Sequence, residues 1–361
     1  MRKALLRRVV LTALPVSLLG CLGLAGNTCF VLPILVLLCL GLGGCEHEGL
    51  LGPVDDSPRQ ITFGSASEWE PAWSPDGRFI AFSLRTRIWV VSLESGFVER
   101  VEGIESGDQP GWSGDAAHLV YRSRPRPGAY GIAIVPLDGG APMERTNVPN
   151  GSANPAWSPD GQFIAFSRFA EHNSDIWIAP VSGEPPTQVT SHPEGDYYPA
   201  WSPDSEWLAF TSGRGRPGTG DIWILPVAAP EQARPITSGL RWASHPCWSP
   251  DGTLIAFQST ESGNDDIWIV PVAGGDPVNV TNDPSRDVHP SFSANGDRIA
   301  FSSSRTGRTH VWTMVVPQVA PNQPMQRSAF ARRWRDQRLG GYDLGSQGDR
   351  SATHAYALRR F

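Results

Sequence analysis

Cysteine is nearly absent from most of this chain. Of its five cysteines, Cys21, Cys29, Cys39 and Cys45 lie within the first 45 residues, and only Cys247 follows them. A single cysteine cannot form an intrachain disulfide, so a disulfide framework beyond residue 45 is excluded. Because no hydrolase constellation accompanies Cys247, we interpret it as a small buried residue rather than a nucleophile.

Catalytic and cofactor motifs are also missing. No Gly-x-Ser-x-Gly elbow occurs, and the stretch Gly111-Trp-Ser-Gly114 belongs to a repeat described below. The sequence contains no Gly-rich phosphate loop and no paired-cysteine zinc spacing. We therefore expect no cofactor, and the sequence gives no positive sign of an enzyme.

Positive charge is scarce in the middle of the chain. Residues 46–316 hold 33 acidic and 18 basic residues, a difference of −15. This acidic balance argues against nucleic acid as a partner. Residues 317–361 hold 8 Arg and 3 Asp and lack any repeat, so we expect an Arg-rich, disordered tail there.

The N-terminus has the pattern of an export signal. Arg2, Lys3, Arg7 and Arg8 precede an apolar stretch that reaches Gly44 without an acidic residue. We predict a signal peptide over residues 1–44 and a lipidated linker over residues 45–57. The protein would then be an exported, membrane-anchored lipoprotein that faces the periplasm or the cell surface.

The lipidated residue has two candidates. Leu42-Gly-Gly-Cys45 resembles a bacterial lipobox, and Leu18-Leu-Gly-Cys21 fits the same pattern. We favour Cys45 as the lipidation site, because the apolar run ends there and polar residues follow. An uncleaved membrane anchor is the alternative, although Pro33 and the glycines interrupt its apolar run.

A short phrase, in its fullest form Pro-Ala-Trp-Ser-Pro-Asp-Gly, returns along the chain at intervals of 39, 45, 44, 47 and 44 residues. Its copies begin at Pro71, Pro110, Pro155, Pro199, Pro246 and Pro290. A period of about 40–45 residues with turn signals in each unit is typical of propeller blades. We predict an all-β, six-bladed β-propeller of four-stranded antiparallel blades over residues 58–316.

Two further features support this fold. The stretch Pro58–Phe63 resembles the fourth strands of later units, and the last unit lacks one, so we expect an N-terminal strand to close the ring. The repeated tryptophans are expected to pack between blades, because large aromatic side chains fill the space between sheets.

The residue just before each opening proline is predicted to ring the mouth of the central channel. These residues are Glu70, Gln109, Asn154, Tyr198, His245 and His289. Arg241 and Trp242 lie on a loop beside the same mouth, and Arg, Tyr and Trp often dominate binding surfaces. Arginines on the outer loops of this face could bind a partner or could balance nearby acids; they are Arg85, Arg124, Arg126, Arg168, Arg214, Arg216, Arg305 and Arg308.

The mouth allows two functions. His245, His289 and Gln109 could hold a divalent metal, because imidazole nitrogen and amide oxygen are suitable ligands. Alternatively, polar residues line a hydrated channel whose mouth binds a partner protein. The sequence alone leaves both open, and we favour the non-catalytic binding module.

The phrases Trp-Ser-Pro-Asp-Gly, Ile-Ala-Phe and Asp-Ile-Trp resemble the TolB family of six-bladed propellers over residues 58–316. This resemblance implies a cell-envelope protein that binds another envelope protein or lipoprotein through the channel face, and we expect a monomer. The chain differs in lacking the separate α/β domain that precedes the TolB propeller. Similar repeats occur in oligogalacturonate lyases, which implies the alternative of a metal-dependent, lyase-like carbohydrate-active enzyme.

Overall fold

The repeated turn is stabilised by its own side chains. The Ser74 hydroxyl donates to Asp76 Oδ1 at 2.6 Å and accepts the N–H of Phe79 at 2.9 Å. Gly77 then takes a φ of +74°, which glycine adopts without steric cost. The Ser–Asp or Ser–Asn bond recurs in all six repeats, so each repeat encodes a tight hairpin turn between its first two strands.

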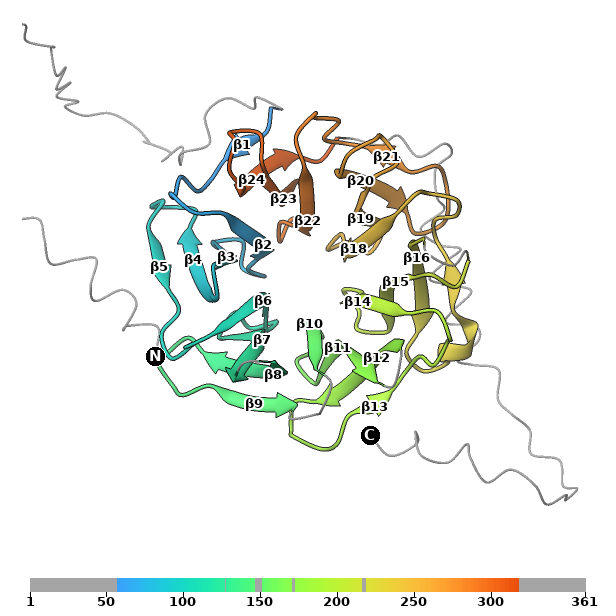
Figure 1. The fold of residues 1–361 in the computed structure, drawn as a ribbon, viewed down its shortest axis with the longest axis horizontal. Coiled ribbons are helices and arrows are strands. Elements are labelled where there is room, and N and C mark those ends of the chain that lie inside the picture. Colours follow the sequence, from blue (N-terminus) through green and yellow to red (C-terminus); the bar gives the residue numbers. More distant parts are fainter. Residues whose placement is uncertain (1–56, 127, 147–150, 171–172, 216–218, 318–361) are drawn as a thin grey trace, which may run out of the picture. The chain divides into compact units, whose positions relative to one another are not determined.

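The computed structural model describes residues 57–126, 128–146, 151–170, 173–215 and 219–317. Six four-stranded antiparallel sheets are arranged in a ring (Figure 1), which confirms the predicted fold class. The predicted signal peptide, almost all of the linker and the Arg-rich tail lie outside the described residues. None of the described residues belongs to a helix long and apolar enough to cross a membrane.

The strands occupy equivalent places in each sheet, from the channel outward. The first strands are β2 (Glu68–Trp73), β6 (Gly107–Trp112), β10 (Ser152–Trp157), β14 (Asp196–Trp201), β18 (Ala243–Trp248) and β22 (Asp287–Phe292). The second strands are β3 (Phe79–Leu84), β7 (His118–Arg126), β11 (Phe163–Ala170), β15 (Trp207–Ser212), β19 (Leu254–Ser259) and β23 (Arg298–Ser303).

The outer two strands complete each sheet. The third strands are β4 (Arg87–Ser92), β8 (Ala129–Pro136), β12 (Asn173–Pro180), β16 (Asp221–Pro226), β20 (Asp266–Pro271) and β24 (His310–Val315). The fourth strands are β5 (Val98–Arg100), β9 (Met143–Thr146), β13 (Thr187–Gln188), β17 (Arg234–Pro235), β21 (Val278–Asn279) and β1 (Arg59–Gln60). A short 3₁₀ helix, η1 (Pro230–Gln232), precedes β17.

The N-terminal strand β1 pairs antiparallel with β24, with Arg59 opposite Thr313 and Gln60 opposite Trp312. Thr62 follows β1 and accepts the N–H of Val311 through its hydroxyl at 3.0 Å. Thr190 does the same for Ile176 in the third blade, at 3.0 Å. The segment after residue 57 therefore serves as the fourth strand of the last sheet.

The core lies between neighbouring sheets. Ile80, Ala81 and Phe82 on β3 are fully buried, and the Ile-Ala-Phe pattern repeats this on other second strands. The repeated tryptophans also form hydrogen bonds between neighbouring blades. Trp112 Nε1, for example, donates to the Ala72 carbonyl of the preceding blade at 2.9 Å. The expectation that these tryptophans pack between blades is confirmed.

Cys247 differs from expectation in its burial. It is half-buried, and its Sγ accepts the N–H of Phe292 on the next blade at 3.4 Å. Burial raises the pKa of the Cys247 thiol to about 11, so the residue is a protonated thiol at neutral pH. A thiol in this state is a poor nucleophile, which agrees with the reading of Cys247 as structural.

Candidate functional site

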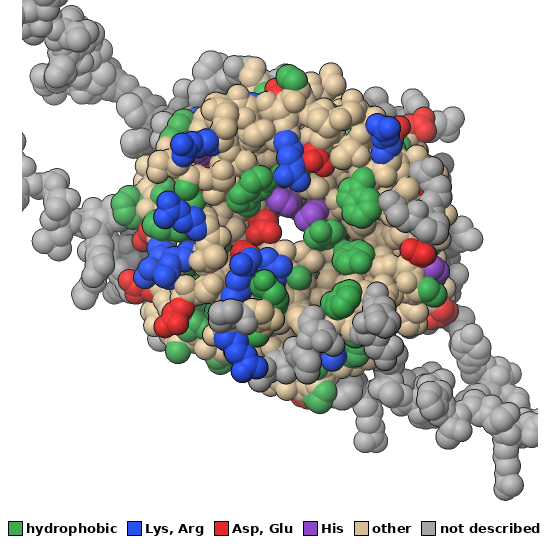
Figure 2. Space-filling view, viewed as in Figure 1, with side chains coloured by type: hydrophobic (Ala, Val, Ile, Leu, Met, Phe, Trp, Pro, Cys, Tyr) green, Lys and Arg blue, Asp and Glu red, His purple; other side chains and the backbone are tan. Residues whose placement is uncertain are grey.

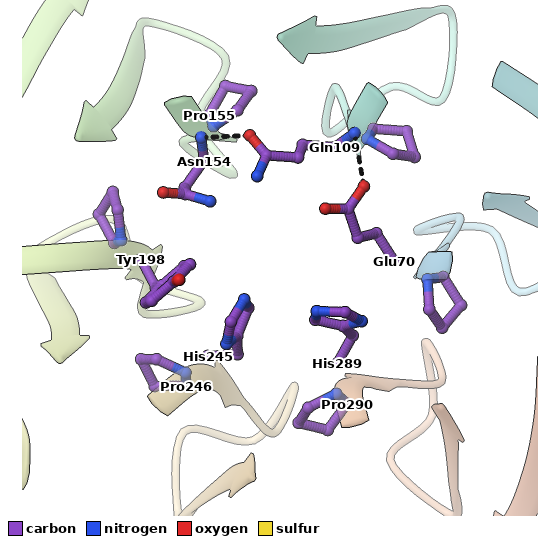
Figure 3. A pocket seen from close by; sticks show the side chains of 12 residues that line it. Glu70, Gln109, Asn154, Pro155, Tyr198, His245, Pro246, His289 and Pro290 are labelled. Carbon is purple, nitrogen blue, oxygen red and sulfur yellow. Dashed lines mark hydrogen bonds between the residues drawn. The ribbon is translucent and has the colours of Figure 1, made fainter. Parts of the chain in front are cut away.

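The six residues predicted to ring the channel come together around one cavity. Glu70, Gln109, Asn154, Tyr198, His245 and His289, each followed by a buried proline, line a space of about 170 Å³. One residue comes from the first strand of each blade, and Figure 3 shows their side chains converging on the channel. At the central opening, His and Glu side chains are visible, with Arg and hydrophobic side chains around them (Figure 2).

A backbone irregularity aims these side chains inward. Each of the six residues has a positive φ, between 54° and 58°, although none is glycine. The pairing register shifts at the same places, for example between Trp69 and Ala72 on β2, which marks a β-bulge. A left-handed backbone costs an L-residue about 1–2 kcal/mol. The fold thus keeps strained residues at six positions where glycine would remove both the strain and the side chain.

Hydrogen bonds from the backbone N–H of four of these six residues to the preceding blade support the bulges. The N–H of Gln109 donates to Glu70 Oε2 at 2.9 Å, and the Ser83 hydroxyl donates to the same oxygen at 2.8 Å. The N–H of Asn154 donates to Gln109 Oε1 at 2.8 Å. Similar bonds link Tyr198 to Ser167 at 3.0 Å and His289 to Gln258 at 3.0 Å.

One wall of the cavity is aromatic. The rings of Tyr198 and His245 have centroids 3.6 Å apart and planes tilted by 30°, and His245 meets His289 edge-on at 4.6 Å. His289 in turn lies edge-on to Trp69, with centroids 6.1 Å apart. The opposite wall consists of Glu70, Gln109 and Asn154, so the cavity has one aromatic side and one polar side (Figure 3).

Both imidazoles are neutral at physiological pH. Burial, and then the nearby charge of Arg286, lower the pKa of His289 to about 3. Burial also holds the pKa of His245 well below its usual value, with further contributions from His289 and Arg286. On the polar wall, burial and then Asp108 raise the pKa of the Glu70 carboxyl. The cavity therefore offers neutral ring nitrogens and one carboxyl group.

Three buried polar atoms around the cavity have no hydrogen-bond partner among the described residues. They are His289 Nδ1, Thr211 Oγ1 and Ser302 Oγ. Ser167 on β11 and Gln258 on β19 each accept a backbone N–H from a channel-lining residue of the next blade. Thr211 on β15 and Ser302 on β23 occupy the equivalent position in their own strands. Thr211 and Ser302 therefore lack the hydrogen bond that Ser167 and Gln258 make at the equivalent positions.

Arg241 and Trp242 lie outside the cavity lining. Both precede β18, and both are exposed, with 39% of Trp242 accessible. The N–H of Arg241 donates to Glu261 Oε2 at 2.9 Å. These two residues lie on the loop that precedes β18, and neither lines the cavity, whereas His245 on β18 does.

Several of the outer-loop arginines have structural partners. Arg214 binds buried Asp196 at 2.5 Å, and Arg305 binds buried Asp287 at 2.7 Å. Arg124 binds Asp108 in the same way. For these three the arginine balances a buried acid, and sequence reasoning missed the aspartates. Their position in the repeat could have identified these aspartates, because each lies one or two residues before a channel-lining residue. Arg216 lies outside the described residues.

The donor set for a metal is incomplete. Within the described parts of the chain, no group of three His, Cys, Asp or Glu side chains is placed to hold a metal ion. His245 and His289 are adjacent, but the oxygen of Gln109, the third proposed ligand, already accepts the Asn154 N–H. No third His, Cys, Asp or Glu of the described residues is placed to complete a donor set with His245 and His289.

Comparison with known proteins places the chain in a family. Residues 109–243 and 216–330 match the family model of the TolB beta propeller domain. Together these matches span residues 109–330, which is more than half of the 361 residues. The chain belongs to the TolB β-propeller family. The family resemblance drawn from the repeated phrases is thereby confirmed.

The curated relatives of this TolB-family chain match only in part. An uncharacterized protein of Agrobacterium fabrum, Atu1656, is 32% identical over 125 residues, which cover 30% of this chain and 43% of that protein. An uncharacterized peptidase of Bacillus subtilis, YuxL, is 29% identical over 106 residues, which cover 26% of this chain and 16% of that protein. The chain thus spans less than half of the length of either relative.

Solved structures share the fold at lower identity. A protein assigned as TolB from Agrobacterium tumefaciens superposes with a TM-score of 0.58 at 22% identity, covering 71% of this chain and 93% of that one. An oligogalacturonate lyase solved in complex with manganese gives a TM-score of 0.52 at 19% identity, covering 72% and 80%. At these identities the similarity establishes the propeller fold alone.

Proposed function

We propose that this protein is a non-catalytic cell-envelope module that binds another envelope protein or lipoprotein at the channel mouth. The observation that carries the proposal is the set of six side chains held at positive φ around one cavity. Glycine at these six positions would relieve the backbone strain, but it would also remove the side chain. Backbone strain of this kind clusters at functional sites. Membership of the TolB family supports an envelope role.

We further propose that the module is exported and lipid-anchored through Cys45. The positively charged, then apolar, N-terminus and the Leu42-Gly-Gly-Cys45 sequence support this anchor. Metabolic labelling with a palmitate analogue tests it, because Cys45→Ser should abolish labelling while Cys21→Ser leaves it intact. Labelling that depends on Cys21 would place the anchor there instead.

Site-specific photo-crosslinking in intact cells tests the binding face. A photoreactive residue at Trp242, beside the mouth, should crosslink one envelope protein that the same residue at Phe97 does not reach. Phe97 is a matched control, because it is 66% exposed and lies on the β4–β5 turn, at the opposite end of the strands from the mouth. Combining Tyr198→Ala with His245→Ala should abolish the Trp242 product; an unchanged product would contradict the proposal.

The second candidate is a metal-dependent, lyase-like carbohydrate-active enzyme at the same mouth. Two adjacent neutral imidazoles, His245 and His289, favour it, and an oligogalacturonate lyase of this fold has been solved with manganese. The lack of a third His, Cys, Asp or Glu ligand among the described residues counts against it. Elemental analysis of the purified chain distinguishes the two candidates: stoichiometric metal that is lost in His245→Ala and His289→Ala supports the enzyme.

A further inference from the structure

The cavity holds one carboxylate and no basic side chain. Glu70 is the sole acid, and neither Arg nor Lys occurs, among the described residues that line it. We propose that the cavity accepts a cationic side chain, a Lys or Arg of the protein partner, with Glu70 as its counterion. This inference rests on the proposed function and names the chemistry of the partner group that enters the channel.

The charge of Glu70 is not required by the fold. Its Oε2 accepts the Gln109 N–H at 2.9 Å and thereby links two blades. One blade further on, the neutral amide of Gln109 makes the equivalent link to the Asn154 N–H at 2.8 Å. A glutamine at position 70 could therefore accept the same bond, and the negative charge serves something other than blade packing.

No Arg, Lys or His side chain of the described residues forms an ion pair or a hydrogen bond with the Glu70 carboxylate. Arg122 interacts with Glu70 electrostatically, but its guanidinium forms a bidentate pair with Asp108 at 2.6 and 2.7 Å, and Arg124 also binds Asp108. Arg286 pairs with Asp265 at 2.7 Å. His245 and His289 are uncharged, because burial and Arg286 lower the pKa of both. A half-buried carboxylate that no cation contacts directly is electrostatically costly, in line with the burial that raises the pKa of Glu70, and an incoming cation would relieve that cost.

The remaining surface of the cavity suits such a group. Glu70 Oε1 has no hydrogen-bond partner in the described parts of the chain, and its carboxylate points into the channel (Figure 3). The Nδ1 atom of His289 is likewise unpartnered. The aromatic wall of Tyr198 and His245 can contact a cation through its ring faces. A space of about 170 Å³ admits the end of one side chain, whereas whole-ligand pockets reach about 300–1,000 Å³.

The test compares two probes of nearly equal shape. Nα-acetyl-arginine amide and its citrulline analogue differ in the charge of the side chain. Each is titrated into the full-length chain with a chelator present, and binding is followed by the NMR chemical shifts of the histidine imidazoles. We expect arginine to bind at least tenfold more tightly than citrulline, a difference of about 1.4 kcal/mol. Glu70→Gln should bring arginine to the affinity of citrulline.

A matched control keeps the comparison specific to the cavity. Glu144 accepts a hydrogen bond from Ser123 at 2.9 Å, as Glu70 does from Ser83, but does not line the cavity. Glu144→Gln should therefore preserve the tenfold preference. Equal binding of both probes, no binding of arginine, or a preference that survives Glu70→Gln would each overturn the inference. If crosslinking from Trp242 still depends on Tyr198 and His245, the proposed function stands while this inference fails.

Discussion

Replacement of Gln109 separates the strain at the ring from the hydrogen bond that its side chain makes. Gln109→Ala removes the bond from the Asn154 N–H to Gln109 Oε1, 2.8 Å long, but keeps an L-residue at a φ of 57°. Gln109→Gly removes the same bond and also relieves the backbone strain. The two variants differ only in this strain and in the flexibility of the unfolded chain.

The magnitudes can be worked out from these two terms. Loss of the bond to the half-buried Asn154 N–H should cost about 1 kcal/mol of the free energy of unfolding. Glycine should recover about 1–2 kcal/mol of strain and lose about 0.5–1 kcal/mol through the greater entropy of the unfolded chain. Gln109→Gly should therefore be more stable than Gln109→Ala by about 0.5–1 kcal/mol.

Denaturant unfolding measures this difference, and thermal unfolding should show it as a shift of about 1–4 °C for a domain of this size. Ala72→Gly serves as the control, because Ala72 lies on the same kind of strand without a positive φ. That substitution should destabilise the protein by about 0.5–1 kcal/mol. If Gln109→Gly is no more stable than Gln109→Ala, the strain argument for the ring is wrong.

Three further substitutions test other parts of the structure. Ala116→Gly, at a turn position with a φ of 56° where other repeats carry glycine, should raise the free energy of unfolding by about 0.5–1 kcal/mol in chemical denaturation. Trp248→Phe should lower it by about 1 kcal/mol, because the bond from Trp248 Nε1 to the Ala200 carbonyl at 3.1 Å is lost while the ring still packs. Burial, and then Asp196, raises the pKa of Asp175 to about 6, so the folded protein binds this proton more tightly than the unfolded chain, and stability should fall as pH rises from about 4 to 6. Asp175→Asn should flatten that fall in a series of unfolding curves, and an unchanged slope would contradict the assignment.

The repeat made the fold predictable, because its local chemistry is complete within a few residues. Ser74, Asp76 and Gly77 form their turn without help from distant residues, and the consecutive apolar residues Ile80, Ala81 and Phe82 specify a buried strand. The strand at Arg59–Gln60 could be assigned to the last blade because its neighbour Thr62 matches the threonines of other fourth-strand segments. Because the same turn and strand patterns recur in several repeats, each copy strengthens the assignment of the others.

The electrostatics of the site could not be predicted in the same way. Whether Arg214 binds a partner or a buried aspartate depends on where the hairpin places it against Asp196, 18 residues earlier in the chain. The neutral state of His245 and His289 follows from their burial beside one another and near Arg286. Such burial is a property of six assembled blades and of no single repeat.

The sequence by itself determined the number of blades, the place of the turns, and which residue of each repeat lines the channel. The tertiary structure decided that these six residues lie at positive φ, that they divide into an aromatic and a polar wall, and that no Arg or Lys of the described residues lines the cavity beside Glu70. The physical reason is that turns and strands arise from neighbouring residues. Strain, burial and charge pairing at the channel arise only where six separate strands meet.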